Sequence, residues 1–160
     1  MGDKMDLEQL ENMIHARNIT LIKDDIPVDK MKGLYFDNTI VFDRSLSTSA
    51  EKICILAEEL GHYETGSGDI LDQSQIANRK QERKAHRWAA QELITLDDII
   101  RASKEGIYNF FELAEFLNIT EDFLREGLEI LKEIYGTHTE YDGKIIQFEP
   151  LDVWDEERNK

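Results

Sequence analysis

The sequence predicts an α+β fold, because extended segments gather near both ends of the chain and helical segments fill the middle. Short apolar runs typical of strands occur within residues 19–42 and again within residues 138–149. Between them, most of residues 48–135 show the three- and four-residue apolar spacing of amphipathic helices. Because strands and helices are segregated, we expect a small antiparallel sheet packed on a central helix, with further helices and a hairpin near the C-terminus.

The first elements are predicted from short local patterns. An amphipathic helix is expected over residues 5–17 and a strand over residues 19–22. Residues 33–36 and 39–42 read as a hairpin, since Asp37-Asn38 between them suits a tight turn.

Four capping residues then mark the starts of helices, because each has a side chain that can accept a hydrogen bond from the first helical turn. They are Thr48, Thr95, Asn109 and Thr120. A further long helix is expected over residues 75–94.

The C-terminal part is expected to close with a hairpin over residues 138–149, turned at Asp142-Gly143. The charged tail after Trp154 is expected to be frayed. We therefore divide the chain into a core over residues 1–105 and a helical segment over residues 106–160, which together could form one compact domain.

Composition limits the class of protein. The 160 residues suit about one domain, and 41% hydrophobic residues are enough to bury a core. The single cysteine, Cys54, excludes an internal disulfide framework, and its apolar setting indicates a reduced, buried thiol. The N-terminus lacks the apolar region of a signal peptide, and no run approaches the about 18 apolar residues of a membrane span. We expect a soluble cytoplasmic protein without membrane association.

The formal net charge of −15 disfavours direct nucleic-acid binding, which depends on lysines and arginines that neutralise phosphates. A basic protein partner is compatible with this charge, although solubility alone also explains it.

The stretch AEELGHYE, residues 57–64, carries the first candidate site residues. Glu58 and His62 are four residues apart and so share one face of the predicted helix, where both could bind a metal ion. Glu59 lies about a quarter-turn away, the place for a general base that acts on water. The alternative is a surface helix on which acidic residues are scattered.

The helix over residues 75–94 supplies a candidate third ligand. Glu82 continues the apolar stripe of Ala85, Ala89 and Leu93, so it should point inward. His86 follows four residues later and is the rival ligand, but we favour a partly buried helix histidine. The same helix carries five basic residues that we interpret as a solvated face, with a nucleic-acid patch as the weaker reading: Arg79, Lys80, Arg83, Lys84 and Arg87.

Three stretches resemble the ImmA/IrrE family of metallopeptidases, in particular its phage, prophage and mobile-element members. Together they cover roughly residues 30–150, and the first two are the specific ones. They are GLYFDNTIVFDRSLSTSAEKICILAEELGHYETG, NRKQERKAHRWAAQELI and ELAEFLNITEDFLREGLEIL with the hairpin that follows.

The resemblance implies a zincin-like fold and a zinc-dependent endopeptidase that cleaves a helix-turn-helix repressor and so relieves repression. By position, Glu59 matches the catalytic glutamate, His62 the second motif histidine and Glu82 the third ligand. Glu58 stands where the usual H-E-x-x-H motif has its first histidine. The extra carboxylate makes manganese or iron alternatives to zinc. Tyr63 and His86 are auxiliary candidates.

Two interpretations from other classes stay open. In the first, the protein is a catalytically weak or inactive peptidase-fold module that only binds a repressor or another regulatory protein. In the second, ELAEFLNITEDFLREGL forms a DNA-reading helix pair. Charge opposes the second, because residues 110–134 contain seven acids and two bases.

If the protein is a peptidase, we expect one of its strands to pair with an extended substrate, and we place this strand at residues 39–42.

Overall fold

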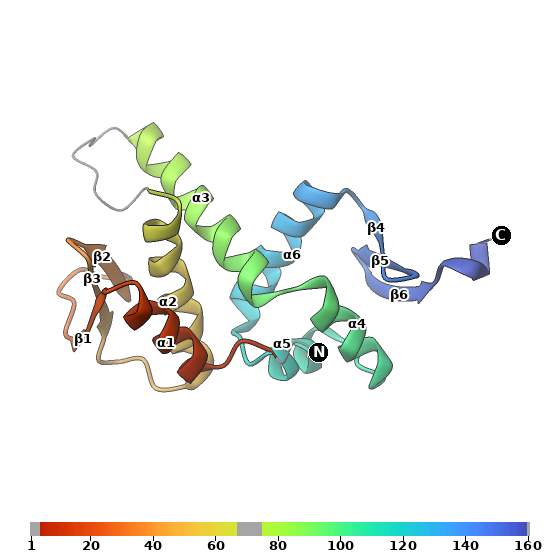
Figure 1. Cartoon of the computed structure of the whole chain (residues 1–160), viewed down its shortest axis with the longest axis horizontal. Coiled ribbons are helices and arrows are strands. Elements are labelled where there is room, and N and C mark those ends of the chain that lie inside the picture. Colours follow the sequence, from red (N-terminus) through yellow and green to blue (C-terminus); the bar gives the residue numbers. More distant parts are fainter. Residues whose placement is uncertain (1–3, 67–74, 160) are drawn as a thin grey trace.

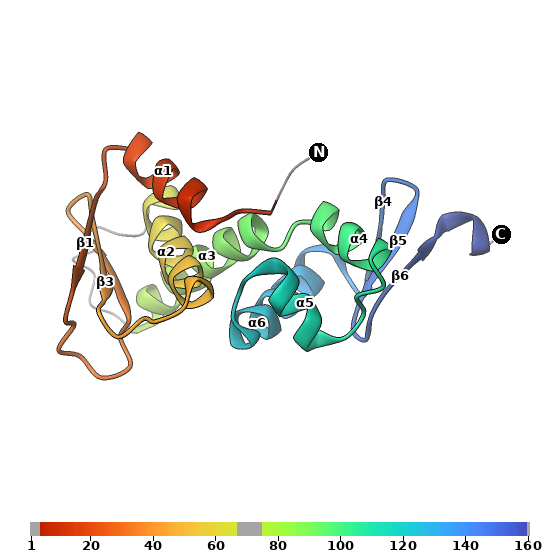
Figure 2. The ribbon, with the colours of Figure 1, turned by 90° about the horizontal axis from the view of Figure 1, so that it is seen from below.

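The computed structural model describes residues 4–66 and 75–159, and these form an elongated α+β molecule. Within these residues, six α-helices lie between two three-stranded sheets, one at each end (Figures 1 and 2). This arrangement confirms the predicted α+β class. None of the helices in the described ranges is both long enough and apolar enough to cross a membrane.

The N-terminal elements follow the predicted order. They are α1 (Leu7–Ala16), β1 (Thr20–Asp24), β2 (Gly33–Phe36), β3 (Thr39–Asp43), α2 (Ser49–Glu64) and α3 (Gln75–Leu93).

Of the C-terminal elements, the three helices begin where their capping residues predicted. They are α4 (Leu96–Lys104), α5 (Phe110–Leu117), α6 (Glu121–Tyr135), β4 (His138–Tyr141), β5 (Lys144–Phe148), β6 (Leu151–Asp155) and a 3₁₀ turn (Glu156–Asn159). All four predicted caps accept a hydrogen bond from a backbone N–H three residues on: Thr48, Thr95, Asn109 and Thr120.

The first sheet has the strand order β1-β3-β2, and it is mixed. The β2–β3 hairpin is confirmed, with Asp37 and Asn38 both at positive φ in its turn. The prediction of an antiparallel sheet is wrong for β1, which pairs with β3 in parallel. The apolar β3 takes the central position, where Ile40 is fully buried, and the more polar β1 is left at an edge.

The second sheet has the order β4-β5-β6 and is antiparallel throughout. Its first hairpin turns at Asp142-Gly143, as predicted. Beyond the predicted hairpin, β6 adds a third strand in which Asp155 lies opposite Lys144 and forms an ion pair with it. The fraying expected after Trp154 stays a prediction. Leu151 and Val153 of β6 pack against the core, and this burial holds the strand in place.

Helix α2 lies at the centre of the core, and α3 packs directly along it (Figure 1). The apolar stripe of α2 is fully buried and consists of Ile53, Leu56, Ala57 and Leu60. The two helices approach closely at Gly61, where an added Cβ would lie only 2.6 Å from the carbonyl oxygen of Ala85. Only glycine leaves room for this approach.

Further contacts join α2 and α3 to the C-terminal helices. The backbone N–H of Thr120 donates to Sγ of Cys54 across 3.5 Å. The Cys54 thiol is free and buried, as predicted, and burial raises its pKa to about 12. On α6, Gly127 faces Ile94, whose Cδ1 would lie 2.3 Å from an added Cβ.

Asp43 ties the loop that follows β1 to the loop that follows β3. One carboxylate oxygen accepts the backbone N–H of Ile26 and the other that of Ser45, each across 2.9 Å. The hydrogen bond from the Ser45 side chain, together with these two backbone bonds, lowers the pKa of Asp43 to about 2.

We predict that Gly61→Ala destabilises the protein more than Gly127→Ala does. At Gly61 the new methyl group meets backbone that cannot move away, which costs about 1–3 kcal/mol. At Gly127 it meets the flexible end of Ile94, and the gain in helix propensity offsets part of the strain. Urea unfolding followed by circular dichroism measures both free energies. Equal stability of the two variants would contradict the close helix packing.

We predict that Asp43 contributes to stability above pH about 4 and that this contribution is lost as the pH falls toward about 2. The sign follows because the pKa of Asp43 is lower in the folded chain than in the unfolded chain, where it is near 3.8. Asp43→Asn should therefore lower stability at pH 7 and flatten its dependence on pH between these values. Asp25→Asn, at an exposed carboxylate, is the control. Parallel pH curves for wild type and Asp43→Asn would contradict the prediction.

Candidate metal centre

The candidate site lies between α2 and α3, directly beside their closest approach. Gly61 precedes His62 on α2, and Ala85 precedes His86 on α3, so the tight contact brings both histidines together. The carboxylates of Glu58 and Glu82 belong to the same helix faces, one turn before these histidines.

Four side chains form a continuous chain of contacts at this place. Nε2 of His62 lies 3.2 Å from Oε1 of Glu82, and Nε2 of His86 lies 3.8 Å from Oε2 of the same glutamate. Nδ1 of His86 lies 3.3 Å from Oε1 of Glu58. The structure therefore brings together all three predicted ligands and the rival ligand His86.

The contacts raise the pKa of both histidines. Burial lowers the pKa of His62, but the hydrogen bond and the charge of Glu82 outweigh it and raise the pKa overall. The hydrogen bond with Glu58 raises the pKa of His86 to about 8, against the effect of burial. The His62 hydrogen bond in turn lowers the pKa of Glu82. Imidazole and carboxylate groups thus alternate along the cluster, in the order His62, Glu82, His86 and Glu58.

Glu59 behaves differently from its neighbours. Burial raises the pKa of Glu59 to about 7, although the charge of His62 and a hydrogen bond from the Tyr35 backbone oppose this rise. Strand β2 covers it closely, because a Cβ on Gly33 would lie 2.9 Å from Oε1 of Glu59. A carboxyl group that titrates near neutral pH is suited to accept and return a proton.

Two residues take part in ways that the sequence pattern did not settle. The spacing of His86 from Glu82 gave its helix face, but its contact with Glu58 depends on how α3 lies against α2. Glu126 of α6 reaches within 4.0 Å of Nδ1 of His86 and was not predicted. No local signal marks Glu126, since it is one exposed acid on an acidic amphipathic helix.

Tyr63 points toward the first sheet. Its ring packs edge-on against Tyr35 of β2, with ring centres 6.1 Å apart. Its auxiliary role in catalysis remains a prediction.

The donor types fit a divalent metal ion. Imidazole nitrogen and carboxylate oxygen are both zinc ligands, and two ligands of one tetrahedral zinc lie about 3.3 Å apart. The 3.2 Å between His62 and Glu82 matches this separation. Within residues 4–66 and 75–159, no three such side chains are already gathered around one point as metal ligands. The carboxylate of Glu58 instead contacts His86.

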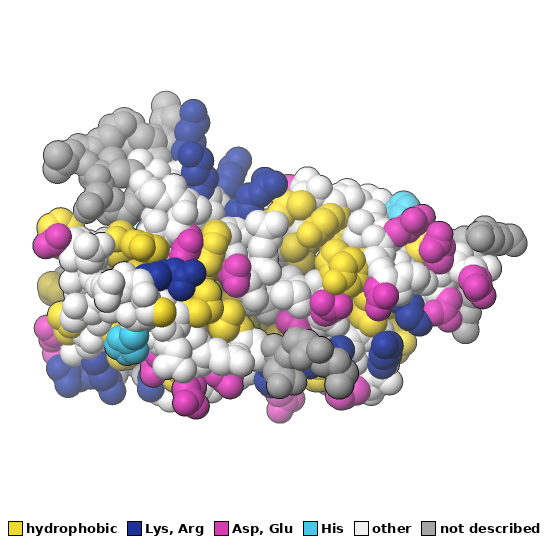
Figure 3. Space-filling model, viewed as in Figure 1, with side chains coloured by type: hydrophobic (Ala, Val, Ile, Leu, Met, Phe, Trp, Pro, Cys, Tyr) yellow, Lys and Arg dark blue, Asp and Glu magenta, His cyan; other side chains and the backbone are white. Residues whose placement is uncertain are grey.

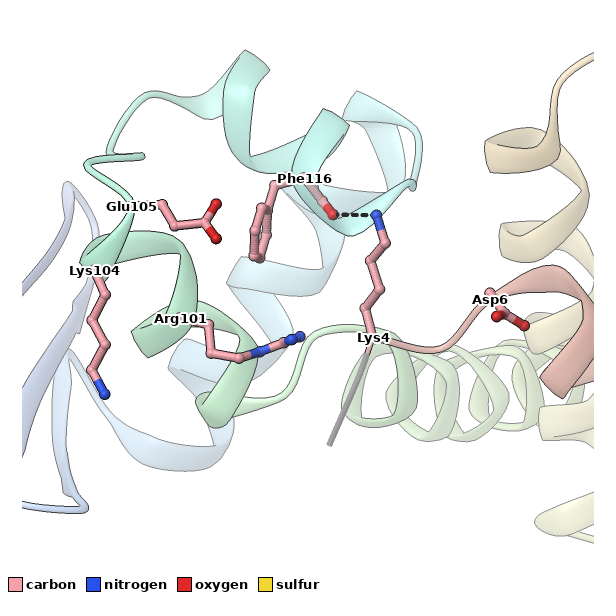
Figure 4. A pocket seen from close by; sticks show the side chains of 6 residues that line it. All are labelled: Lys4, Asp6, Arg101, Lys104, Glu105 and Phe116. Atoms are coloured by element: carbon pink, nitrogen blue, oxygen red, sulfur yellow. Dashed lines mark hydrogen bonds between the residues drawn. The ribbon is translucent and has the colours of Figure 1, made fainter. Parts of the chain in front are cut away.

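A cavity of about 520 Å³ lies elsewhere, where the N-terminal segment meets α4 and α5 (Figure 4). Lys4 and Arg101 flank the ring of Phe116, and Nζ of Lys4 donates to the Phe116 carbonyl across 2.8 Å. Since α4 and α5 both end here, the cations lie against the negative ends of two helices. Their contacts indicate a structural role.

Helix α2 carries the pattern E-E-x-x-H, and the adjacent α3 carries E-x-x-x-H. This pair of patterns is typical of metal-dependent hydrolases and indicates that class. Residues 14–129 match the family model described as the IrrE N-terminal-like domain, Peptidase_M78, and the chain belongs to this family. This is a metallopeptidase family, and membership confirms the predicted resemblance.

Comparison with known proteins adds support for the fold alone. A solved structure described as a Mycobacterium tuberculosis transcriptional regulator is similar, with a TM-score of 0.56 and 15% sequence identity. The match covers 78% of this chain but only 40% of that one. No curated protein matches the sequence.

Proposed function

We propose that this protein is a metal-dependent endopeptidase in which Glu59 is the general base. The observation that carries the proposal is geometric: Glu59 lies under β2, next to the cluster in which His62 is 3.2 Å from Glu82 and His86 is 3.3 Å from Glu58. The raised pKa of Glu59, about 7, supports its role as a base. Family membership supports the same activity, since the matching region contains both helices of the cluster.

The residues that would hold the metal ion are Glu58, His62 and Glu82. His86 competes for the carboxylate of Glu58 in the structure, so metal binding would replace that pairing. When bound, the ion supplies Lewis acidity that polarises a carbonyl group and lowers the pKa of water. Zinc is the first candidate, with manganese or iron as alternatives because two of the three donors are carboxylates.

The chain itself supplies the proton transfer. Glu59 accepts a proton from the attacking water and later returns it to the amine that leaves as the peptide bond breaks. Glu59 lies close to Gly33 of β2, and its burial raises its pKa to about 7 in the metal-free chain. A fully exposed glutamate, with an ordinary pKa of about 4.3, would be a weaker base.

The edge strand β2 lies closest to the proposed base. The expectation that residues 39–42 pair with a substrate is wrong, because β3 is central and both of its edges are occupied by β1 and β2. Gly33 and Tyr35 of β2 contact Glu59, so β2 is the strand at which we place an extended substrate.

For the substrate we propose a helix-turn-helix repressor of a phage or mobile element, whose cleavage relieves repression in the cytoplasm. The structure of α5 and α6 opposes the alternative of a DNA-reading pair. Their exposed surface includes the acids Glu112, Glu115, Glu121, Asp122 and Glu126, and such a surface repels phosphates. A catalytically inactive module that only binds the repressor is the second candidate, favoured by the turn of Glu58 toward His86.

We predict that the protein purified without a metal-affinity tag and supplied with zinc binds about one ion per chain. His62→Ala and Glu82→Ala should each lose at least about 90% of this metal, because each removes one of three donors. His15→Ala and Glu140→Ala, at exposed sites away from the cluster, are matched controls. Elemental mass spectrometry measures the content. Wild type that takes up neither zinc nor manganese would support the inactive binding module instead.

We predict that Glu59→Gln lowers cleavage of a co-encoded helix-turn-helix repressor by roughly 10²- to 10⁴-fold and leaves the metal content unchanged. The amide keeps the shape of the side chain but cannot accept the proton. Initial rates from gel densitometry test this. Glu58→Gln is the comparison, since it should lower metal content and activity together. A Glu59→Gln protein that cleaves at the wild-type rate would overturn the role of Glu59.

A further inference from the structure

The exposed surface of α3 carries a row of three arginines. Arg79, Arg83 and Arg87 are spaced four residues apart and therefore lie on one face of the helix, with Lys80 and Lys84 next to them. All five side chains are exposed. Figure 3 shows lysine and arginine side chains gathered over the part of the surface where Figure 1 places α3. We call Arg79, Arg83 and Arg87 the arginine row.

The arginine row has no acidic partner within the described part of the chain. None of its side chains is within ion-pair distance of a carboxylate there, although the chain has 34 acidic and 19 basic residues. Like charges four residues apart repel and weaken a helix. The positive charges of the arginine row are therefore not neutralised by an ion pair within the described residues, so this surface is suited to an acidic partner.

The arginine row borders the candidate metal centre. Glu82 and His86 form the neighbouring row of the same helix, displaced by one residue from Arg83 and Arg87. The Glu82 side chain is 59% exposed, so the cluster opens to solvent on α3. A segment lying along the arginine row would thus pass directly beside the site.

The spacing of the row selects an extended peptide. Four helical residues advance about 6 Å, and the whole row spans about 12 Å. In an extended peptide, alternate side chains lie on the same side and are about 6.6 Å apart. Three acids in the pattern acid-x-acid-x-acid would therefore match the three arginines. Guanidinium groups bind carboxylates through paired hydrogen bonds, which favours arginine over lysine here.

We propose that the arginine row binds an extended acidic segment of the protein substrate, with alternating carboxylates, beside the bond that is cleaved. This inference rests on the proposed peptidase function and names the class of substrate segment. Duplex DNA fits less well, because the row is short and the chain around it has a net charge of −15.

The test uses fluorescence anisotropy at low ionic strength with the full chain. The probe is a fluorescein-labelled peptide, Gly-Glu-Ala-Glu-Ala-Glu-Ala-Gly, and its Gln-for-Glu counterpart is the neutral control. Arg83→Gln/Arg87→Gln removes two arginines of the row while keeping good helix formers. Lys23→Gln/Lys30→Gln removes the same charge from two exposed positions, one in β1 and one in the loop before β2, and is the matched control.

We expect the acidic peptide to bind wild type and to bind Arg83→Gln/Arg87→Gln at least about tenfold more weakly, since two charge-assisted pairs are lost. The lysine control should stay within about twofold of wild type, since only the distant field changes. The neutral peptide should not bind. Equal affinities of the two double variants would overturn the proposal.

Two further probes test the kind of partner. A peptide with three adjacent glutamates has the same charge, and binding as tight as that of the alternating peptide would overturn the extended register. A labelled 20-base-pair duplex that binds through the same arginines more tightly than the peptide would overturn the acidic segment in favour of nucleic acid. Since binding requires no cleavage, Glu59→Gln protein gives the same readout even if the peptidase function fails.

Discussion

The close approach of α2 and α3 at Gly61 is the constraint on which the rest of the site depends. A side chain at this position would meet the backbone of Ala85, so glycine allows the helices to pack with their backbones nearly in contact. His62 and His86 follow these two residues immediately, and their carboxylate partners lie one turn earlier. The contact therefore fixes the spacing within the core and the geometry of the cluster together.

The same packing divides the carboxylates into two kinds. Glu58 and Glu82 face histidines across the helix interface, and the hydrogen bond with His62 keeps the pKa of Glu82 low. Glu59 points instead under the first sheet, where burial raises its pKa to about 7. The surroundings thus raise the pKa of one glutamate, Glu59, and lower that of another, Glu82. This difference is the reason for proposing one as the base and the other as a ligand.

The sequence predicted the local features well and the long-range ones less well. Helix starts at Thr48 and Thr120 and the turn at Asp37-Asn38 depend on a few neighbouring residues, so the pattern alone identifies them. The parallel pairing of β1 with β3 and the addition of β6 depend on which edges become covered once the chain has folded. These are tertiary effects that no short window contains.

The site shows the same division. Helical spacing and the family motif place Glu58, Glu59, His62 and Glu82 on definite helix faces, so the sequence alone indicates them as candidates. The direction of His86 and the approach of Glu126 depend on the angle between packed helices. A pattern in one helix cannot give that angle.

The charge distribution connects the site to its proposed substrate. A chain with a net charge of −15 attracts basic partners at long range, and a DNA-binding repressor presents a basic surface to phosphates. The arginine row reverses this preference locally, beside Glu82 and His86. A substrate with a basic domain and an acidic extended segment would bind with its basic domain facing the acidic surface and its acidic segment facing the arginine row. The global charge would then bring the partner to the protein, and the arginine row would place its extended segment across the site.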